Sequence, residues 1–178
     1  MIDDKPEIAK STLLKFSDLL RYQLYECQDH FIPLKKELAH VASYVELEKI
    51  RHGADATIQL HLPEEIGSEQ ISPLLFTPFL ENAFKYLSNQ DEGTKNQVFI
   101  DFRLQDGQLF FEIENTIDPM PHRLQKEGGI GIQNVKKRLA LLYPKRHQLD
   151  IFKREDRFIV RLNIELTKGN YVSDTFEV

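Results

Sequence analysis

Cysteine is almost absent from this chain of 178 residues, which contains Cys27 alone. A single thiol can form no disulfide within the chain and cannot provide the several thiolates of a structural zinc site, so both are excluded. The sequence also lacks an apolar run near the ~20 residues that cross a bilayer. Residues 1–10 are charged, unlike a signal peptide. We therefore expect a soluble chain, suited to a reducing compartment, that could be a piece of a longer protein.

Basic clusters are missing too. The formal net charge is -5 at pH 7, and no dense lysine or arginine run is present, so nucleic acid is not an expected partner. The six histidines form no metal-binding pair such as His-Glu-x-x-His, and no Ser-His-Asp grouping can be recognised. Hydrophobic residues make up 41% and charged residues 29%, a globular balance that fits one domain plus an appendage.

Hydrophobic periodicity predicts alternating helices and strands. Helices are expected over residues 8–27, 33–53, 72–87 and 132–142, and strands over 57–62, 97–104, 108–115, 148–154 and 157–166. Pro78 should kink the third helix or restart it. Asp106-Gly107 is the strongest hairpin signal, because this pair favours a type I′ turn. The order predicts an α/β (α+β) two-layer sandwich, with a mixed, mostly antiparallel sheet and helices on one face, preceded by an amphipathic helix.

One polar face in the third helix could hold a ligand. Glu81, Asn82 and Lys85 lie opposite its apolar side, and Tyr86 follows. An amide oxygen can ligate Mg²⁺, a lysine can contact a phosphate as a point charge, and a tyrosine can lie against a flat base. The same residues also suit a solvated surface with an ordinary Glu81–Lys85 ion pair.

Two further segments could contribute to such a site. Three glycines at 128–131 precede the fourth helix, and a glycine loop at a helix N-terminus exposes N–H groups that suit phosphate. This loop is neither a Rossmann fingerprint nor a Walker A loop. Asn115 ends the second hairpin strand, a common place for a ligand-reading side chain. The alternatives are a flexible connector for the glycines and a turn-forming role for Asn115.

Read together and in order, these segments resemble the C-terminal part of LytS-type sensor histidine kinases. The stretches that carry the resemblance are FIPLKKELAHVASYVELEKIRHG (31–53), SPLLFTPFLENAFKY (72–86) and GGIGIQNVKKRLALLYP (128–144). The resemblance extends from about residue 13 to 166, and the motifs are specific jointly rather than singly.

The resemblance implies the Bergerat, or GHKL, ATPase fold, with ATP and Mg²⁺ as cofactors. Asn82 would ligate the Mg²⁺ that bridges the ATP phosphates, and Glu81 beside it would assist phosphoryl transfer. The γ-phosphoryl group would pass to a histidine and then to a response regulator, with catalysis coming chiefly from positioning and charge neutralisation. Lys85 would contact phosphate, and Tyr86 would approach the nucleotide. Gly129 and Gly131 match the glycine box of the family, where a mobile lid closes over the phosphates.

The adenine side departs from the family pattern. Relatives carry an aspartate followed by glycines where this chain has Asn115 and no glycine nearby. An amide oxygen still accepts a hydrogen bond from the adenine amine, but without charge assistance worth ~1 kcal/mol. Asp118 is an alternative residue for this contact.

The phosphoacceptor histidine of the family is expected upstream, and the sequence does not contain its Asn-Pro-His-Phe stretch. His30-Phe31 matches two letters of that stretch, but the flanking Asp29 and Ile32 do not, so we do not expect His30 to accept phosphate. The resemblance implies three parts: residues 1–30, the second helix of the dimerisation hairpin; 31–166, the ATP-binding domain; and 167–178, a tail. By itself this chain should not autophosphorylate.

The resemblance also implies partners: the phosphoacceptor helix of the parent kinase, a response regulator of LytTR type, and a second copy through residues 8–27. The parent protein would be membrane-anchored, with this part on the cytoplasmic side. A different class of function stays open, a degenerate GHKL module that binds partners without turning over ATP. A chaperone or topoisomerase type of ATPase is disfavoured by the short length.

Overall fold

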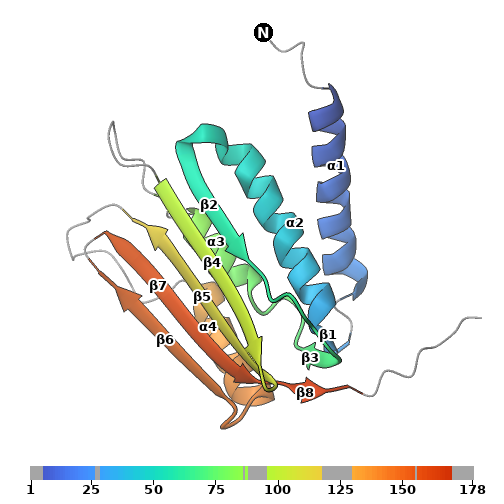
Figure 1. The fold of residues 1–178 in the computed structure, drawn as a ribbon, viewed down its shortest axis with the longest axis vertical. Coiled ribbons are helices and arrows are strands. Elements are labelled where there is room, and N and C mark those ends of the chain that lie inside the picture. Colours follow the sequence, from blue (N-terminus) through green and yellow to red (C-terminus); the bar gives the residue numbers. More distant parts are fainter. Residues whose placement is uncertain are drawn as a thin grey trace, which may run out of the picture.

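The computed structural model describes residues 6–26, 29–85, 87, 96–117, 130–154 and 156–169. They form two layers, a five-stranded sheet and helices that cover one of its faces (Figure 1). The strands of the main sheet are β2 (Ala56–His61), β4 (Asn96–Gln105), β5 (Gln108–Thr116), β6 (His147–Lys153) and β7 (Arg157–Glu165). The helices are α1 (Pro6–Arg21), α2 (Leu34–His52), α3 (Thr77–Lys85) and α4 (Ile130–Leu142). The predicted two-layer α/β architecture is confirmed.

The main sheet is mixed and mostly antiparallel, as predicted. Its strand order is β2-β4-β5-β7-β6, and only the β2–β4 pair is parallel among the described strands. The β4–β5 hairpin turns at Asp106 and Gly107, whose φ angles are 51° and 78°. A type I′ turn requires positive φ at both central positions, so the predicted turn is present.

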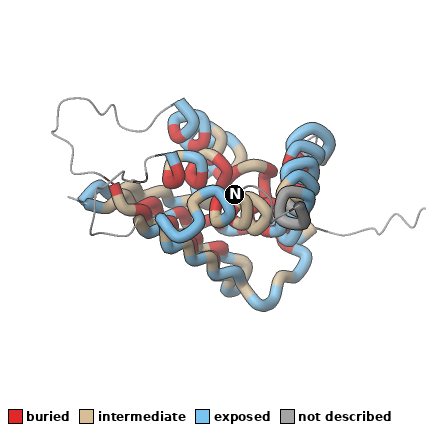
Figure 2. The backbone as a smooth tube through the Cα atoms, turned by 90° about the horizontal axis from the view of Figure 1, so that it is seen from above, coloured by how far each residue is buried: buried red, intermediate tan, exposed pale blue. Residues whose placement is uncertain are grey.

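The core lies between the sheet and the helices, where Figure 2 shows the buried residues gathered. Phe76, which precedes α3, has its ring centroid 4.9 Å from that of Phe102 on β4 and 4.8 Å from that of Phe111 on β5. Offset and edge-to-face aromatic contacts at these distances add to the gain from burial. This cluster fixes the approach to α3 against the middle of the sheet.

Helix α2 follows the sequence pattern closely. Its apolar stripe, Leu34, Leu38, Val41 and Val45, is buried. The helix ends at Gly53, which has a φ of 55°. Glycine adopts this left-handed conformation with little steric strain, because it has no Cβ. Pro33 immediately precedes the first turn.

The third helix begins later than predicted, and of the two predicted effects of Pro78 the structure shows a helix start and no kink. Residues 73–76 form turns, and α3 begins only at Thr77, so Pro78 lies in its first turn and causes no kink. Leu74 has a φ of 55°, which a continuous helix cannot contain. The backbone N–H groups of Leu74 and Leu75 donate instead to the carboxylate of Glu37 on α2, at 2.9 and 3.0 Å.

The N-terminal helix lies beside α2 (Figure 1). It was predicted as one helix, and it continues from α1 into a π-helical segment, η1 (Tyr22–Glu26). Leu19 and Tyr22 are buried, whereas the predicted apolar stripe is largely exposed. Its exposed members are Leu13, Phe16, Leu20 and Leu24. Among the described residues, the apolar side of this helix is therefore only partly covered.

A small second sheet was not predicted. It joins β1 (Ile32–Pro33), β3 (Glu69–Ile71) and β8 (Thr167–Lys168) in the order β1-β3-β8. Strands of two or three residues are too short to show a periodicity in the sequence. Among the described helices, none has both the length and the apolar character needed to cross a membrane.

Candidate functional site

Helix α3 presents the predicted polar face. Phe79, Leu80, Ala83 and Phe84 are buried toward the core, while Glu81 and Lys85 are exposed and Asn82 is half-buried. The Asn82 amide is thus held near the core but remains accessible from outside. Tyr86, the predicted base-contacting residue, lies outside the described residues.

Asn115 occupies a different environment. It lies near the end of β5, between Val98 on β4 and Phe158 on β7, and is only 1% exposed. It shares the face of the strand that carries Phe111 and Ile113, the face covered by helices. Its Nδ2 donates to the carbonyl of Thr116 at 3.0 Å. One of the two N–H donors of the amide is therefore bound to the backbone, and Oδ1 is the atom that can accept a hydrogen bond.

The start of α4 lies against the start of α3. A Cβ added at Gly131 would meet the Cβ of Pro78 at 3.4 Å, so the two helix N-termini are in close contact. Residues 118–129 lie outside the described residues, and with them Gly129 and the alternative adenine residue Asp118. Of the predicted site, the structure describes Glu81, Asn82, Lys85, Asn115 and Gly131.

Core contacts join the three segments that carry the predicted site, which are α3, the end of β5 and the start of α4. Phe79 of α3 lies with its ring centroid 5.8 Å from Phe111 of β5, which fixes α3 over the strand that ends at Asn115. Pro78 fixes the same helix to α4. The segments that carry Asn82, Asn115 and Gly131 are thus parts of one packed unit.

Helix α2 borders the polar face of α3. The Tyr44 ring centroid lies 6.0 Å from that of Phe84. Burial raises the pKa of the Tyr44 hydroxyl, and the nearby carboxylates of Glu48 and Glu81 raise it further. Arg51 Nη2 lies 2.7 Å from Glu48 Oε2. This end of α2 therefore places ionisable groups within electrostatic reach of Glu81.

A buried polar network at the base of α3 was missed. Glu37 is fully buried on α2 and accepts hydrogen bonds from Tyr22 and from the turn before α3. Burial raises the pKa of its carboxyl group, and the hydrogen bonds oppose that shift. One signal was available in the sequence, because Glu37 falls on the helix face of Leu34 and Val41, where only apolar residues are expected.

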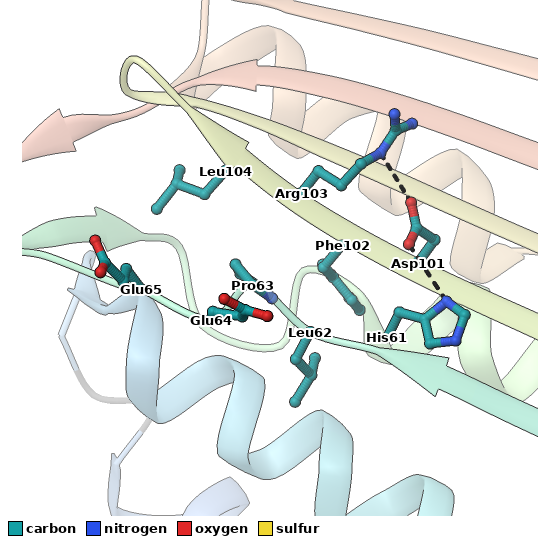
Figure 3. A pocket seen from close by; sticks show the side chains of 9 residues that line it. All are labelled: His61, Leu62, Pro63, Glu64, Glu65, Asp101, Phe102, Arg103 and Leu104. Carbon is teal, nitrogen blue, oxygen red and sulfur yellow. Dashed lines mark ion pairs between the residues drawn. The ribbon is translucent and has the colours of Figure 1, made fainter.

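A shallow pocket of about 440 Å³ lies elsewhere, where β2 ends beside β4 (Figure 3). Asp101 lies between Arg103 and His61 in the lining of this pocket, with its Oδ2 2.9 Å from Arg103 Nε and its Oδ1 3.7 Å from His61 Nδ1. All three side chains lie on the sheet face away from the helices. None of the predicted site residues lines this pocket, so it is separate from the α3 site.

Comparison with known proteins identifies the relatives. The family model described as Histidine kinase matches residues 1–56. The Sensor histidine kinase YpdA of Escherichia coli K12 is 30% identical over 146 residues, which cover 78% of this chain and 26% of that protein. The Sensor protein LytS of Oceanobacillus iheyensis is 27% identical over 158 residues, which cover 82% of this chain and 27% of that protein. The chain thus spans about a quarter of the length of these two relatives.

A solved structure gives the same answer for the fold. The histidine kinase domain of the blue-light activated histidine kinase from Erythrobacter litoralis EL346 superposes with a TM-score of 0.58 at 19% identity, covering 88% of this chain and 80% of that one. The fold is therefore that of a histidine kinase catalytic domain of the GHKL class. In sequence, the chain is similar to the LytS sensor protein of Oceanobacillus iheyensis along most of its length, as its motifs predicted.

Proposed function

We propose that this chain is the ATP-binding catalytic part of a two-component sensor histidine kinase. It would direct the γ-phosphoryl group of ATP to a histidine, from which a response regulator receives it. The fold and the similarity to sensor kinases support this proposal. The observation that carries it is that the half-buried Asn82 and the buried Asn115 lie on segments, α3 and β5, that pack against each other.

The described residues fit a nucleotide and Mg²⁺. Asn82 offers an oxygen ligand at an accessible position, and Glu81 beside it would assist phosphoryl transfer. Lys85 would contact phosphate. Gly131, in the first turn of α4 and next to Pro78 of α3, would keep the lid role implied by the resemblance. The bound Mg²⁺ would neutralise charge on the transferred group, as in other phosphoryl transfers. Tyr86 and Gly129 keep the base and lid roles implied by the resemblance.

Asn115 would read the adenine amine through its amide oxygen. Its donor nitrogen already bonds to Thr116, which leaves the acceptor end for the ligand. A neutral acceptor gives a weaker hydrogen bond than an aspartate by ~1 kcal/mol. We therefore expect weaker ATP binding than in relatives that carry aspartate at this position.

The exposed apolar side of the N-terminal helix, α1 with η1, supports a dimeric parent protein. Leu13 and Leu24 are 68% and 65% exposed, a large fraction for leucines on one helix. We propose that a second copy covers this side, within a membrane-anchored parent whose catalytic part lies on the cytoplasmic side. The phosphoacceptor helix of that parent and a LytTR-type response regulator would be the other partners.

Calorimetric titration with a non-hydrolysable Mg-ATP analogue tests the nucleotide site. We expect binding by the wild-type chain and at least about tenfold weaker binding by Asn82→Ala, because the metal loses a protein ligand. Asn163→Ala is the matched control, since Asn163 is also half-buried but lies on the sheet face away from the helices. Absence of heat from both the wild type and Asn82→Ala would refute the proposal and favour a module that only binds partners.

A further inference from the structure

A single carboxylate connects three segments of the chain. Glu37 of α2 is 0% exposed, and its Oε2 accepts from the Tyr22 hydroxyl at 2.5 Å and from Leu74 N at 2.9 Å. Its Oε1 accepts from Leu75 N at 3.0 Å. Hydrogen-bond donors stabilise the charge of a carboxylate that is buried as deeply as that of Glu37. If one donor is removed, the charge is less well compensated, and the hydrogen bonds from the remaining donors are affected too. The three segments are therefore coupled through one side chain.

The turn that Glu37 holds determines where α3 begins. The Phe76 carbonyl accepts from Phe79 N at 3.0 Å and from Leu80 N at 3.1 Å, so the end of the turn supplies the first acceptors of the helix. Leu74 has a left-handed φ of 55°, which leucine adopts only when its surroundings hold it there. Asn82 follows in the second turn of this short helix. A shift of the turn would therefore move Asn82 as well.

The third segment is the N-terminal helix. Tyr22 opens the π-helical segment η1, is 7% exposed, and stacks on His40 of α2 with ring centroids 4.2 Å apart. The Tyr22 hydroxyl and the Leu74 N–H thus donate hydrogen bonds to the same atom, Glu37 Oε2, which links the N-terminal helix to the turn. π-Helical turns inside helices occur frequently at functional sites.

We propose that Glu37 is a positioning residue through which Tyr22 of the N-terminal helix sets the conformation of the 73–76 turn, and with it the position of Asn82 on α3. Through this turn, the N-terminal helix would act indirectly on the candidate nucleotide site. Only the last link, the effect on ligand binding, rests on the proposed function. The link from Tyr22 to the turn stands on the hydrogen bonds of the ligand-free chain.

Amide hydrogen exchange of the ligand-free chain tests the first link. Tyr22→Phe keeps the ring and its stacking but removes the hydroxyl donor. The carboxyl group then takes up a proton more readily and becomes a weaker acceptor, so we expect the Leu74 and Leu75 amides to exchange about tenfold faster. Tyr25→Phe is the matched control, because Tyr25 lies on the same segment and is 69% exposed. The Val160 and Leu162 amides of β7, an inner strand between β5 and β6, report global opening.

Two results would overturn the coupling. The turn amides could respond to Tyr22→Phe no more than to Tyr25→Phe, or the β7 amides could accelerate by the same factor as the turn amides. The first result would show that the hydroxyl does not act on the turn, and the second that the variant merely loosens the whole fold.

A double-mutant cycle tests whether Glu37 carries the effect. Glu37→Gln has nearly the same shape but no charge for the hydroxyl to stabilise, so Tyr22→Phe should accelerate the turn amides by about twofold or less in that background. An undiminished tenfold effect would show that Tyr22 acts by another route.

Ligand binding tests the last link separately. We expect the Kd of the Mg-ATP analogue to rise about three- to tenfold in Tyr22→Phe and to stay unchanged in Tyr25→Phe. An unchanged Kd in Tyr22→Phe, with the turn amides accelerated, would overturn the link to Asn82. Absence of binding by the wild-type chain would instead refute the proposed function, while the exchange data would still decide the coupling from Tyr22 to the turn.

Discussion

Two sets of polar side chains surround α3, and they differ in burial. Glu81, Asn82 and Lys85 lie on its outer face and are exposed or half-buried. Glu37 and Tyr143 lie beneath its start and are almost completely buried. A polar group in water contributes little to stability, whereas a buried one is costly to leave without a partner. The outer set is therefore accessible to a ligand, and the inner set holds the helix that presents it.

The largest loss of stability is expected from Glu37→Leu. The change leaves the N–H groups of Leu74 and Leu75 and the hydroxyl of Tyr22 without their acceptor, at a cost of about 3 kcal/mol or more. Urea denaturation measures the free energy of unfolding. Glu46→Leu on the same helix is the control, because the Glu46 side chain is 47% exposed, and should change stability by less than about 1 kcal/mol. Equal losses in the two variants would remove the distinction between the sets.

A smaller, pH-dependent effect is expected at His40. Burial lowers the pKa of His40 to about 4, from an ordinary value of 6.5. Below pH 6.5 the unfolded chain binds a proton there that the folded chain does not, so stability falls as the pH falls toward 4. In His40→Leu this contribution is absent, and its loss of stability between pH 7 and pH 5 should be about 1–2 kcal/mol smaller.

The measurement is urea denaturation of both proteins at the two pH values. Glu37, whose pKa is raised, gains relative stability on acidification, but this contribution is present in both proteins and largely cancels. Parallel pH profiles would contradict the buried, neutral state of His40.

Tyr143→Phe should cost about 1–2 kcal/mol. The Tyr143 hydroxyl accepts from Ser72 N at 2.8 Å, and without it that buried N–H loses its partner. Thermal unfolding would detect the change. Tyr25→Phe, which removes an exposed hydroxyl, should leave the unfolding temperature unchanged. No difference between these two variants would show that the turn tolerates loss of its second anchor.

The smallest effect on stability is expected from Asn82→Ala. Asn82 is half-buried on the outer face of α3, and alanine has the higher helix propensity, so the free energy of unfolding should change by less than about 0.5 kcal/mol. Denaturation beside the titration described above separates binding from folding. A loss above 2 kcal/mol would place Asn82 in the inner set.

The sequence predicted the parts of the fold that local signals determine. The stripe of α2 and the Asp106-Gly107 hairpin depend on residues a few positions apart, and both are confirmed. The start of α3 was placed about five residues too early, because Ser72-Pro73 is a local helix signal that a distant carboxylate, Glu37, overrides. The small sheet was missed because its strands pair across long separations, with Glu69 opposite Lys168.

The candidate site shows the same division. The two-faced character of α3 could be predicted from helical periodicity, and the structure agrees. The burial of Asn115 could not, because it depends on which strands flank β5 and which face the helices cover. The roles assigned to Asn82, Lys85 and Gly131 remain predictions that the proposed titrations can test.

The small sheet and the Glu37 network also differ in how early they can assemble. The bonds of Glu37 join residues between 22 and 75, so they can form once the first part of the chain has left the ribosome. Glu69 of β3 can pair only after Lys168 of β8, which lies about a hundred residues later in the sequence, has been synthesised. Loop closure over such a separation is slow, and chains are synthesised from the N-terminus. The Glu37 network at the start of α3 can therefore form before the small sheet is complete. The β3–β8 pairing would be among the last contacts of the fold to form.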